Sequence, residues 1–139
     1  MFWYMICVTC YVALDQITKI VFSSRDFFIF PIHIHLVKNY GLSFGLNFGT
    51  IVNSIVIVVA IIIFTYYLFR DSCRINWGAI LILAGASSNL IDRLVFGFVR
   101  DFIDIGLGFT FNLADLFIFL GLIALLLPST RNNQEQVVE

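Results

Sequence analysis

The sequence carries little charge, and that shortage narrows the class of protein. Lys, Arg, Asp and Glu together make up 12% of its 139 residues, whereas hydrophobic residues make up 60%. Soluble globular chains contain roughly a quarter charged residues. The formal net charge is −1, so the chain lacks the basic excess of a nucleic-acid binder, and no nucleic-acid partner is expected.

Cysteine is scarce too, with three residues. Cys7 and Cys10 form a C-x-x-C, but it lies in an apolar segment with no second pair and no nearby histidine. Small buried apolar side chains are therefore favoured over a zinc or redox site, and Cys73 is expected to be a free thiol in a short loop.

Long uncharged runs are what the sequence has in abundance. They cover residues 1–14, 39–69, 75–91 and 116–130. A helix needs about 20 mostly apolar residues to cross the hydrocarbon core. This predicts four crossings, at roughly 1–22, 50–69, 77–96 and 110–128. The first residues lack the positive region of a secretory signal, so we interpret them as the start of the first crossing.

The predicted fold is therefore an all-α integral membrane protein, a four-transmembrane-helix bundle forming one domain over residues 1–139. The second predicted crossing is apolar all round and is typical of scaffold. The small residues Gly85 to Ser88 in the third allow close helix packing.

An even number of crossings places both termini on one side of the membrane. The positive-inside rule gives no clear orientation. Three arginines fall on one side, and the opposite side holds Arg25, Lys38, Arg93 and Arg100.

Residues 27–46 show a different pattern. Alternation of apolar residues with His33 and His35 is typical of a half-buried strand, and Pro31 marks a strand edge. We expect a small sheet of two or three strands on the membrane surface between the first two crossings. The two histidines share a strand face, so a metal site is conceivable. With no Cys or carboxylate nearby in the sequence, solvent-facing polarity is favoured, and no metal or other cofactor is expected.

Polar residues recur at helical spacing inside the first predicted crossing. Asp15 and Lys19 stand at i, i+4, the favourable order for an ion pair. Charges within a crossing are costly and usually face the interior of a bundle. A structural ion pair and a role in supporting a site both remain open.

The later crossings become polar at the same side of the membrane. Asn89, Asp92 and Arg93 share a face at the end of the third crossing, and Asn112 and Asp115 stand at i, i+3 at the start of the fourth. The polar faces of three crossings thus gather at one interface.

Asp101 and Asp115 flank the connection between the third and fourth crossings and are the candidate catalytic pair. Two close carboxylates cannot both stay ionised, so one keeps a proton and the other can activate water. Peptide-bond hydrolysis without a cofactor is the chemistry that such a pair suggests. The alternative is structural, because Asp115 could simply favour the positive N-terminus of a helix.

Four motifs occur in order along the chain. They are Asp15-Gln16-Ile17-Thr18-Lys19, Asn39-Tyr40-Gly41-Leu42-Ser43-Phe44, the segment SNLIDRLVFGFVRDF from Ser88 to Phe102, and Phe111-Asn112-Leu113-Ala114-Asp115. Their order and spacing resemble the bacterial lipoprotein signal peptidases (signal peptidase II).

The resemblance implies an aspartyl endopeptidase of the bacterial inner membrane that removes the signal peptide from diacylglyceryl-modified prolipoproteins, cleaving before the lipidated cysteine. It implies Asp101 and Asp115 as catalytic residues, with Asn89 and Arg93 lining the site. The residues that it implies as supporting the site are Asp15, Lys19, Asn39, Asp92, Asn112 and Ala114. Membrane lipid is the expected surrounding, and a monomer is expected.

The resemblance also suggests an orientation. The cations near the site would face the extracytoplasmic side with the small sheet, whereas Arg70, Arg74 and both termini would be cytoplasmic. The sequence departs from the family pattern at Ser88, where the family has Gly, and in the short connection 104–111. A non-enzymatic four-helix membrane protein, such as a transport or assembly subunit, is the alternative.

Overall fold

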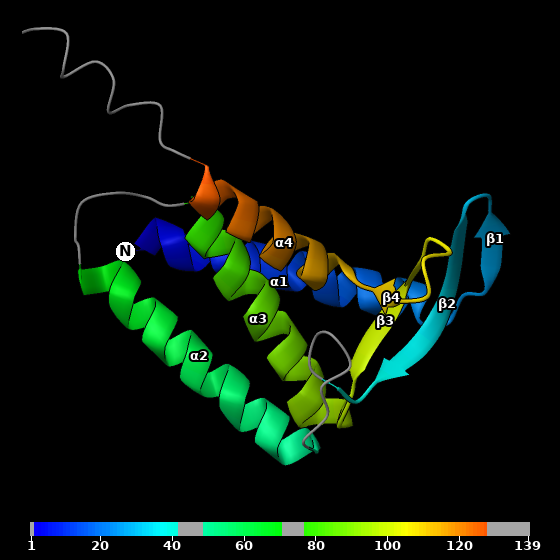
Figure 1. The fold of residues 1–139 in the computed structure, drawn as a ribbon, viewed down its shortest axis with the longest axis horizontal. Coiled ribbons are helices and arrows are strands. Elements are labelled where there is room, and N and C mark those ends of the chain that lie inside the picture. Colours follow the sequence, from blue (N-terminus) through cyan, green and yellow to red (C-terminus); the bar gives the residue numbers. More distant parts are fainter. Residues whose placement is uncertain (1, 42–48, 71–76, 128–139) are drawn as a thin grey trace, which may run out of the picture.

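Four helices make up most of the fold of this computed structural model, which describes residues 2–41, 49–70 and 77–127 (Figure 1). The helices are α1 (Phe2–Phe22), α2 (Thr50–Arg70), α3 (Trp77–Phe96) and α4 (Leu113–Leu126). Among the described residues, α1 and α3 are long and apolar enough to cross a membrane. Shorter apolar stretches cover Ile51–Tyr66 of α2 and the whole of α4.

The start of α4 corrects one predicted boundary. The fourth crossing was expected from about residue 110, but Thr110–Phe111 form a short strand and the helix begins at Leu113. The reason is local. Asn112 has an extended backbone and its side chain accepts a hydrogen bond from the N–H of Asp115, which caps the helix at this point.

Burial in this fold is inverted relative to a soluble protein. Large apolar side chains such as Trp3, Ile51 and Leu126 are 74%, 77% and 82% exposed. The buried positions are largely small or polar, among them Ala84 and Ala114 at 0% exposure. Such an apolar exterior is suited to lipid, since in lipid it is close packing of small residues that brings helices together.

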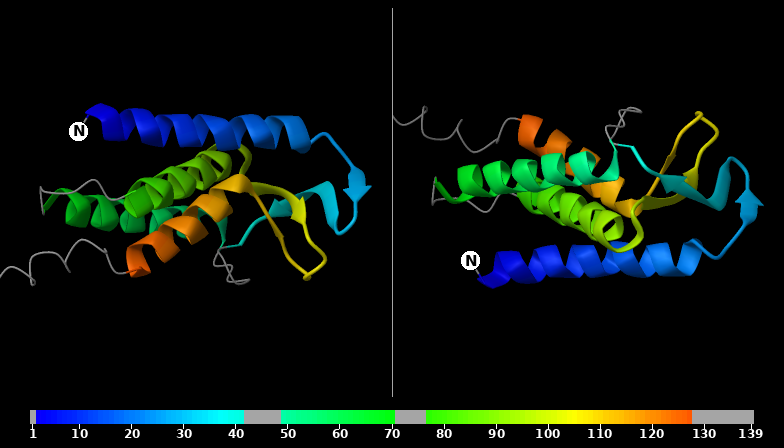
Figure 2. Two further views of the ribbon diagram at one scale, coloured as in Figure 1. Left: turned by 90° about the horizontal axis from the view of Figure 1, so that it is seen from above. Right: turned by 90° about the horizontal axis from the view of Figure 1, so that it is seen from below.

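Glycines set the close approach of α3 and α4. A Cβ atom on Gly78 would lie 2.6 Å from the carbonyl oxygen of Gly121, and one on Gly85 would collide with the carbonyl oxygen of Ala114. The predicted role of the small residues in α3 is thereby confirmed for Gly85. Figure 2 shows α3 and α4 side by side, with α1 and α2 flanking them.

A four-stranded antiparallel sheet lies beyond one end of the helices (Figures 1 and 2). Its strands, in spatial order, are β1 (Phe27–Ile29), β2 (Ile32–Asn39), β3 (Val99–Asp104) and β4 (Thr110–Phe111). The first residues of α1 and the last of α4 lie at the opposite end of the molecule (Figure 1).

The sheet is larger than predicted. The prediction of two or three strands within 27–46 is right for β1 and β2, while 42–46 lie outside the described residues. It missed β3 and β4. Asp101, which was expected beside the connection between the third and fourth crossings, lies within β3. The segment Val99–Asp104 has polar residues on both faces of the strand, so it lacks the alternation of apolar and polar residues that predicts a strand.

A β-bulge in β2 adjusts how β2 and β3 pair. Ile34 faces Ile103 and Val37 faces Asp101, so three steps along β2 match two along β3. Bulges re-aim side chains next to functional sites. Beyond the bulge, Asn39 lies close enough to donate a hydrogen bond to Asp101.

Candidate active site

Buried polar side chains gather where the sheet meets the helices. Ten are nearly inaccessible: Asp15, Lys19, Asn53, Ser88, Asn89, Asp92, Arg93, Arg100, Asp101 and Asn112. A buried polar group is costly unless it is hydrogen-bonded. Hydrogen bonds and ion pairs organise most of these side chains into two adjoining clusters.

The first cluster, here called the ion-pair cluster, consists of Asp15, Lys19, Asp92 and Arg100. Lys19 Nζ lies 2.8 Å from Asp15 and 3.4 Å from Asp92, with all three side chains fully buried. Arg100 donates to Asp92 through its side chain, at 2.7 Å, and through its backbone N–H, at 3.0 Å. The predicted Asp15–Lys19 pair is confirmed.

Ser88 and Gln16 complete the ion-pair cluster. Ser88 Oγ donates to Asp15 at 2.6 Å, and Gln16 donates to Ser88 Oγ and to Asp92. Asp15 also accepts from the backbone N–H of Ala114, which ties α1 to the start of α4. The hydroxyl at the position where the family has Gly therefore has a partner on α1.

The second cluster, here called the carboxylate pair, contains Asp101 and Asp115 with the asparagines around them. Asp101 is 1% exposed. One of its oxygens accepts from Asn39 at 2.9 Å and the other from Asn112 at 2.6 Å. Within the part of the chain that the structure describes, no Lys or Arg forms an ion pair with Asp101 or Asp115.

Asp115 is held by amides as well. Asn89 donates to one of its oxygens at 2.9 Å, and the backbone N–H of Asn112 donates to the other at 3.1 Å. The second bond is half of a capping box at the start of α4. The structural alternative for Asp115, a role at the N-terminus of a helix, is therefore correct. The same residue also lies next to Asn112, whose side chain donates a hydrogen bond to Asp101.

Asn112 is the residue common to both carboxylates. Its side chain donates to Asp101 and to Asn89, while its backbone donates to Asp115. Lys19 donates to the same Asn89 oxygen at 2.8 Å. The lysine therefore reaches the carboxylate pair through an amide, and its direct ion pairs are with the other cluster.

The environment of Asp101 suits proton transfer. Burial, with the negative charge of nearby Asp115 adding to it, raises the pKa of Asp101 to about 7. A carboxyl group whose pKa lies near neutrality can hold a proton and release it under ordinary conditions. Together the two carboxyl groups can supply both an acid and a base.

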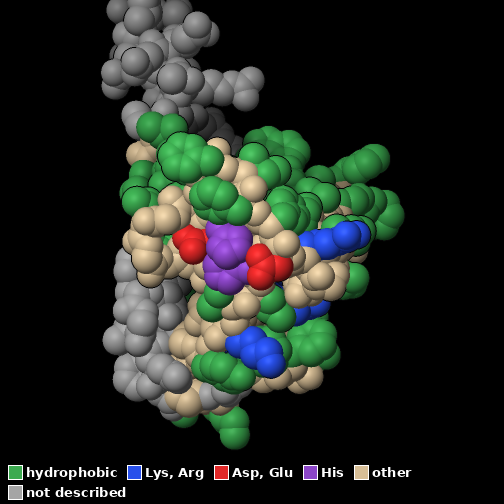
Figure 3. All heavy atoms as spheres, turned by 90° about the vertical axis from the view of Figure 1, so that its right-hand side faces the viewer, with side chains coloured by type: hydrophobic (Ala, Val, Ile, Leu, Met, Phe, Trp, Pro, Cys, Tyr) green, Lys and Arg blue, Asp and Glu red, His purple; other side chains and the backbone are tan. Residues whose placement is uncertain are grey.

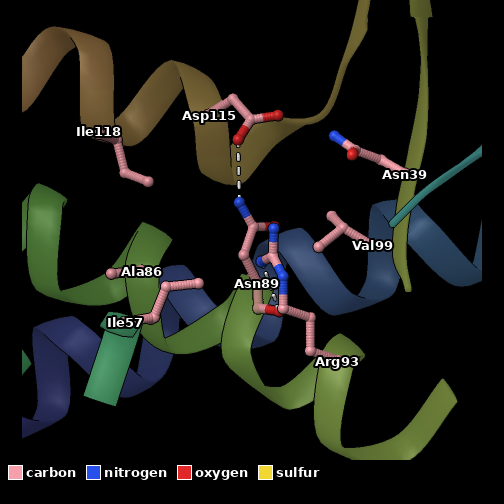
Figure 4. Close-up of a pocket in the computed structure, with 8 residues that line it drawn as sticks. All are labelled: Asn39, Ile57, Ala86, Asn89, Arg93, Val99, Asp115 and Ile118. Atoms are coloured by element: carbon pink, nitrogen blue, oxygen red, sulfur yellow. Dashed lines mark hydrogen bonds between the residues drawn. The ribbon is translucent and has the colours of Figure 1, made fainter. Parts of the chain in front are cut away.

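A cavity of about 120 Å³ opens beside the pair. It is lined by Asn39, Ile57, Ala86, Asn89, Arg93, Val99, Asp115 and Ile118. Figure 4 shows Asp115 and Asn89 joined by their hydrogen bond, with Asn39 and Val99 on one side and Ile57, Ala86 and Ile118 on the other. Space for a reactant therefore adjoins Asp115.

Arg93 is the cation that lines this cavity. It donates to the backbone oxygens of Gly41, at 2.7 Å, and Asn89. Its Nε is buried and has no hydrogen-bond partner among the described residues. One donor thus remains for another group.

The structure brings all ten predicted site residues together, by direct contact or through one shared partner. Three others were missed. Gln16 and Arg100 lie within the quoted motifs, directly next to Asp15 and Asp101. This adjacency to predicted site residues is the sequence signal that could have identified them. Asn53 lies in α2, which was interpreted as pure scaffold, yet it is fully buried and donates to the backbone oxygen of Tyr40.

Comparisons with known proteins agree with this geometry. The family model described as signal peptidase (SPase) II matches residues 7–131. The lipoprotein signal peptidase of Psychromonas ingrahamii is 34% identical over 91% of this chain and 84% of its own. That of Halothermothrix orenii is 36% identical over 88% of this chain and 91% of its own.

Solved structures show the same fold. A bacterial membrane enzyme determined by the in meso method at 2.3 Å superimposes with a TM-score of 0.83 at 25% identity, covering 100% of this chain and 94% of that one. A second, at 1.9 Å, gives 0.77 at 26% identity with 90% of each chain covered. The chain belongs to the signal peptidase II family of aspartic peptidases, membrane enzymes that process lipoproteins.

Proposed function

We propose that Asp101 and Asp115 are the catalytic pair that cleaves a diacylglyceryl-modified prolipoprotein immediately before its lipidated cysteine. The single observation that carries the assignment is that Asn112 binds both carboxyl groups, which holds them next to one another beside the cavity. The two lack direct counter-cations among the described residues.

The proposed reaction is general acid–base hydrolysis. One carboxylate accepts a proton from a water molecule, whose oxygen attacks the scissile carbonyl carbon. The other carboxyl group donates its proton to the carbonyl oxygen, which gives a tetrahedral intermediate with two hydroxyl groups. As the C–N bond breaks, the proton taken from water passes to the leaving amine nitrogen, and the second carboxylate regains a proton from one of these hydroxyl groups. The raised pKa of Asp101, about 7, is consistent with one proton being kept by the pair near neutral pH. No cofactor takes part in these steps.

The supporting residues receive distinct tasks in this proposal. Asn39, Asn89 and Asn112 orient the carboxyl groups by the hydrogen bonds described above. Arg93 lines the cavity, and its unpartnered Nε is a donor for a carbonyl oxygen of the substrate backbone. Asp15, Lys19, Asp92 and Ala114 fix the positions of α1, α3 and α4 around the pair.

We also propose the placement in the membrane. Residues 1–139 would form one peptidase domain with four crossings in the inner membrane, working as a monomer surrounded by lipid. The sheet would lie on the extracytoplasmic side and both termini in the cytoplasm. The sheet lies at one end of the molecule, and the first residues of α1 and the last residues of α4 lie at the other end, which supports this topology (Figure 1). The non-enzymatic alternative is not favoured, because the family consists of peptidases.

The test is cleavage of a purified diacylglyceryl-prolipoprotein by the full chain in detergent, with Asp101→Asn and Asp115→Asn alongside. Loss of a general acid or base typically costs about 10²–10⁴-fold in rate. Both variants should lose at least about 10²-fold, while Asp26→Asn, whose carboxylate is 79% exposed, should retain activity. Cleavage by either pair variant at the normal rate would refute its catalytic role.

A further inference from the structure

A second polar cluster lies on the sheet, away from the carboxylate pair. His33 and His35 come from β2, and Asp104 lies at the end of β3 directly opposite His33. Figure 3 views the molecule from the sheet end and shows the histidines together on the surface with an acidic side chain on either side. The sequence did not connect Asp104 with the histidines, because Asp104 lies about 70 residues further along the chain.

We propose that His33, His35 and Asp104 form a binding site for a divalent transition-metal ion of the zinc type. Each residue offers one ligand atom, and these three atoms all lie within 4.8 Å of one another. The imidazole rings are close to each other, with centroids 4.2 Å apart. Zn²⁺ commonly takes three protein ligands from His and carboxylate side chains and leaves its fourth position to water.

The ligand atoms need only a modest contraction to bind the ion. Bonds of about 2.1 Å in a tetrahedral site place ligand atoms roughly 3.4 Å apart. All three side chains are only half-buried, so rotation about their side-chain bonds can bring them closer. The bulge between Ile34 and Val37 leaves the backbone of β2 unpaired with β3 next to His35.

An unpartnered nitrogen is the independent observation that points to a ligand here. Nδ1 of His35 is buried and has no hydrogen-bond partner among the described residues. A buried polar atom without a partner is uncommon in native structures and calls for an explanation such as a missing ion. A metal ion bound at the three residues would place such a partner next to Nδ1 of His35.

The neighbours of the three residues resemble the second shell of a metal site. Asp26 lies 2.9 Å from Nε2 of His33, so an N–H at Nε2 leaves the lone pair of Nδ1 free. Metal-binding histidines usually donate their other N–H to a carboxylate or carbonyl in this way. Asp104 is oriented likewise, since one of its oxygens accepts from the backbone N–H of Gly106 at 2.7 Å.

The site would fasten β2 to β3, the strands that carry Asn39 and Asp101. It does not depend on the proposed peptidase chemistry, because none of its ligands belongs to the carboxylate pair. Failure of one proposal therefore leaves the other standing.

The test is direct metal binding by the full chain in detergent micelles, without an affinity tag. Cys7, Cys10 and Cys73 are replaced by Ser, so that thiolates cannot bind the metal. Zn²⁺ is titrated against a chelating dye, and Co²⁺ binding is followed by its visible d–d absorption. We expect one ion per chain with a Kd in the micromolar range.

Variants locate the ion. His35→Ala and Asp104→Asn should each weaken binding by at least tenfold, and Asp26→Asn by about 10-fold, the lower end of the effect of losing a second-shell partner. Asp101→Asn is the matched control, since its carboxyl group is on the same strand but outside the cluster, and binding should be unchanged. Thermal unfolding without metal checks that each variant is folded.

Two results would overturn the proposal. One is a wild-type affinity for Zn²⁺ weaker than millimolar. The other is binding that survives both His35→Ala and Asp104→Asn, or that disappears in Asp101→Asn, which would place the ion at the carboxylate pair instead.

Discussion

The ion-pair cluster and the carboxylate pair adjoin each other but treat their carboxylates differently. Asp92 is bound by Arg100 and Lys19, and Asp15 by Lys19. Asp101 and Asp115 receive hydrogen bonds from amides. A cation holds a carboxylate in its ionised form, whereas a neutral amide can bind it without fixing its protonation state as strongly. In the ion-pair cluster, cations neutralise the carboxylates and hold the helices together. In the carboxylate pair, no cation is paired with either carboxyl group among the described residues, so these groups can exchange protons.

The largest expected effect is on the free energy of unfolding, which should respond differently to one substitution in each cluster. Asp92→Asn leaves the buried Arg100 guanidinium without its counter-charge and should destabilise the fold by about 3–5 kcal/mol. Asp101→Asn removes a carboxyl group whose ionised form burial disfavours, so it should not destabilise the fold and should raise the free energy of unfolding at neutral pH. Unfolding in mixed micelles with increasing denaturing detergent measures both, and equal losses would remove the distinction.

The next effect concerns the helix seam that holds both clusters together. Gly85→Val places its side chain against the carbonyl oxygen of Ala114 and against Ile118. Overpacking of this kind costs about 1–3 kcal/mol, and it should also lower activity by displacing the start of α4. Ala60→Val, at an exposed position of α2, adds apolar bulk as the control and should be neutral. Thermal unfolding and cleavage rate are the measurements.

The pH dependence tests the protonation of the carboxylate pair. Since the pKa of Asp101 is raised to about 7, cleavage should fall about tenfold per pH unit once the pH passes that value, as the pair loses its proton. The free energy of unfolding should change in the same direction as the cleavage rate. The folded state binds the proton more tightly than the unfolded state, whose Asp pKa is about 3.9, so stability falls as pH rises from about 4 to 7. Asp101→Asn should abolish that slope, and a slope of the opposite sign would contradict this account.

The smallest expected effect is a shift in the same profile. The hydrogen bond from Asn39 lowers the pKa of Asp101, partly offsetting burial and the charge of Asp115. Asn39→Ala should therefore move the alkaline limb of the rate profile to higher pH, by less than one unit, and reduce the maximum rate severalfold. A limb that stays in place while only the rate falls would assign Asn39 to positioning alone.

Helical periodicity was a reliable guide to the helices and to the faces they bury. Asp15 with Lys19 and Asn89 with Asp92 and Arg93 were predicted to share faces, and the structure buries them all. The resemblance to signal peptidase II came from motifs in order, and the comparisons confirm it. The catalytic roles assigned to Asp101 and Asp115 remain predictions.

The strands were predicted less well, for an identifiable reason. β2 pairs with β3 across about 60 residues of sequence, and β3 has polar residues on both faces because each face meets a polar cluster. Alternation is a signal only when one face is buried against apolar neighbours. Asp101 was consequently not expected in a strand, and Asp104 was not connected with the histidines.

By itself, the sequence determined the family, the apolar helices and the polar side chains that stand at each helix end, because periodicity and motif order are local properties. Tertiary structure alone decided which carboxylates receive cations and which receive amides. That choice depends on contacts such as Lys19 to Asn89 and Asn39 to Asp101, whose partners are about 60 to 70 residues apart. Only folding brings such groups within hydrogen-bond distance, and a hydrogen bond is decided by differences in position of less than 1 Å.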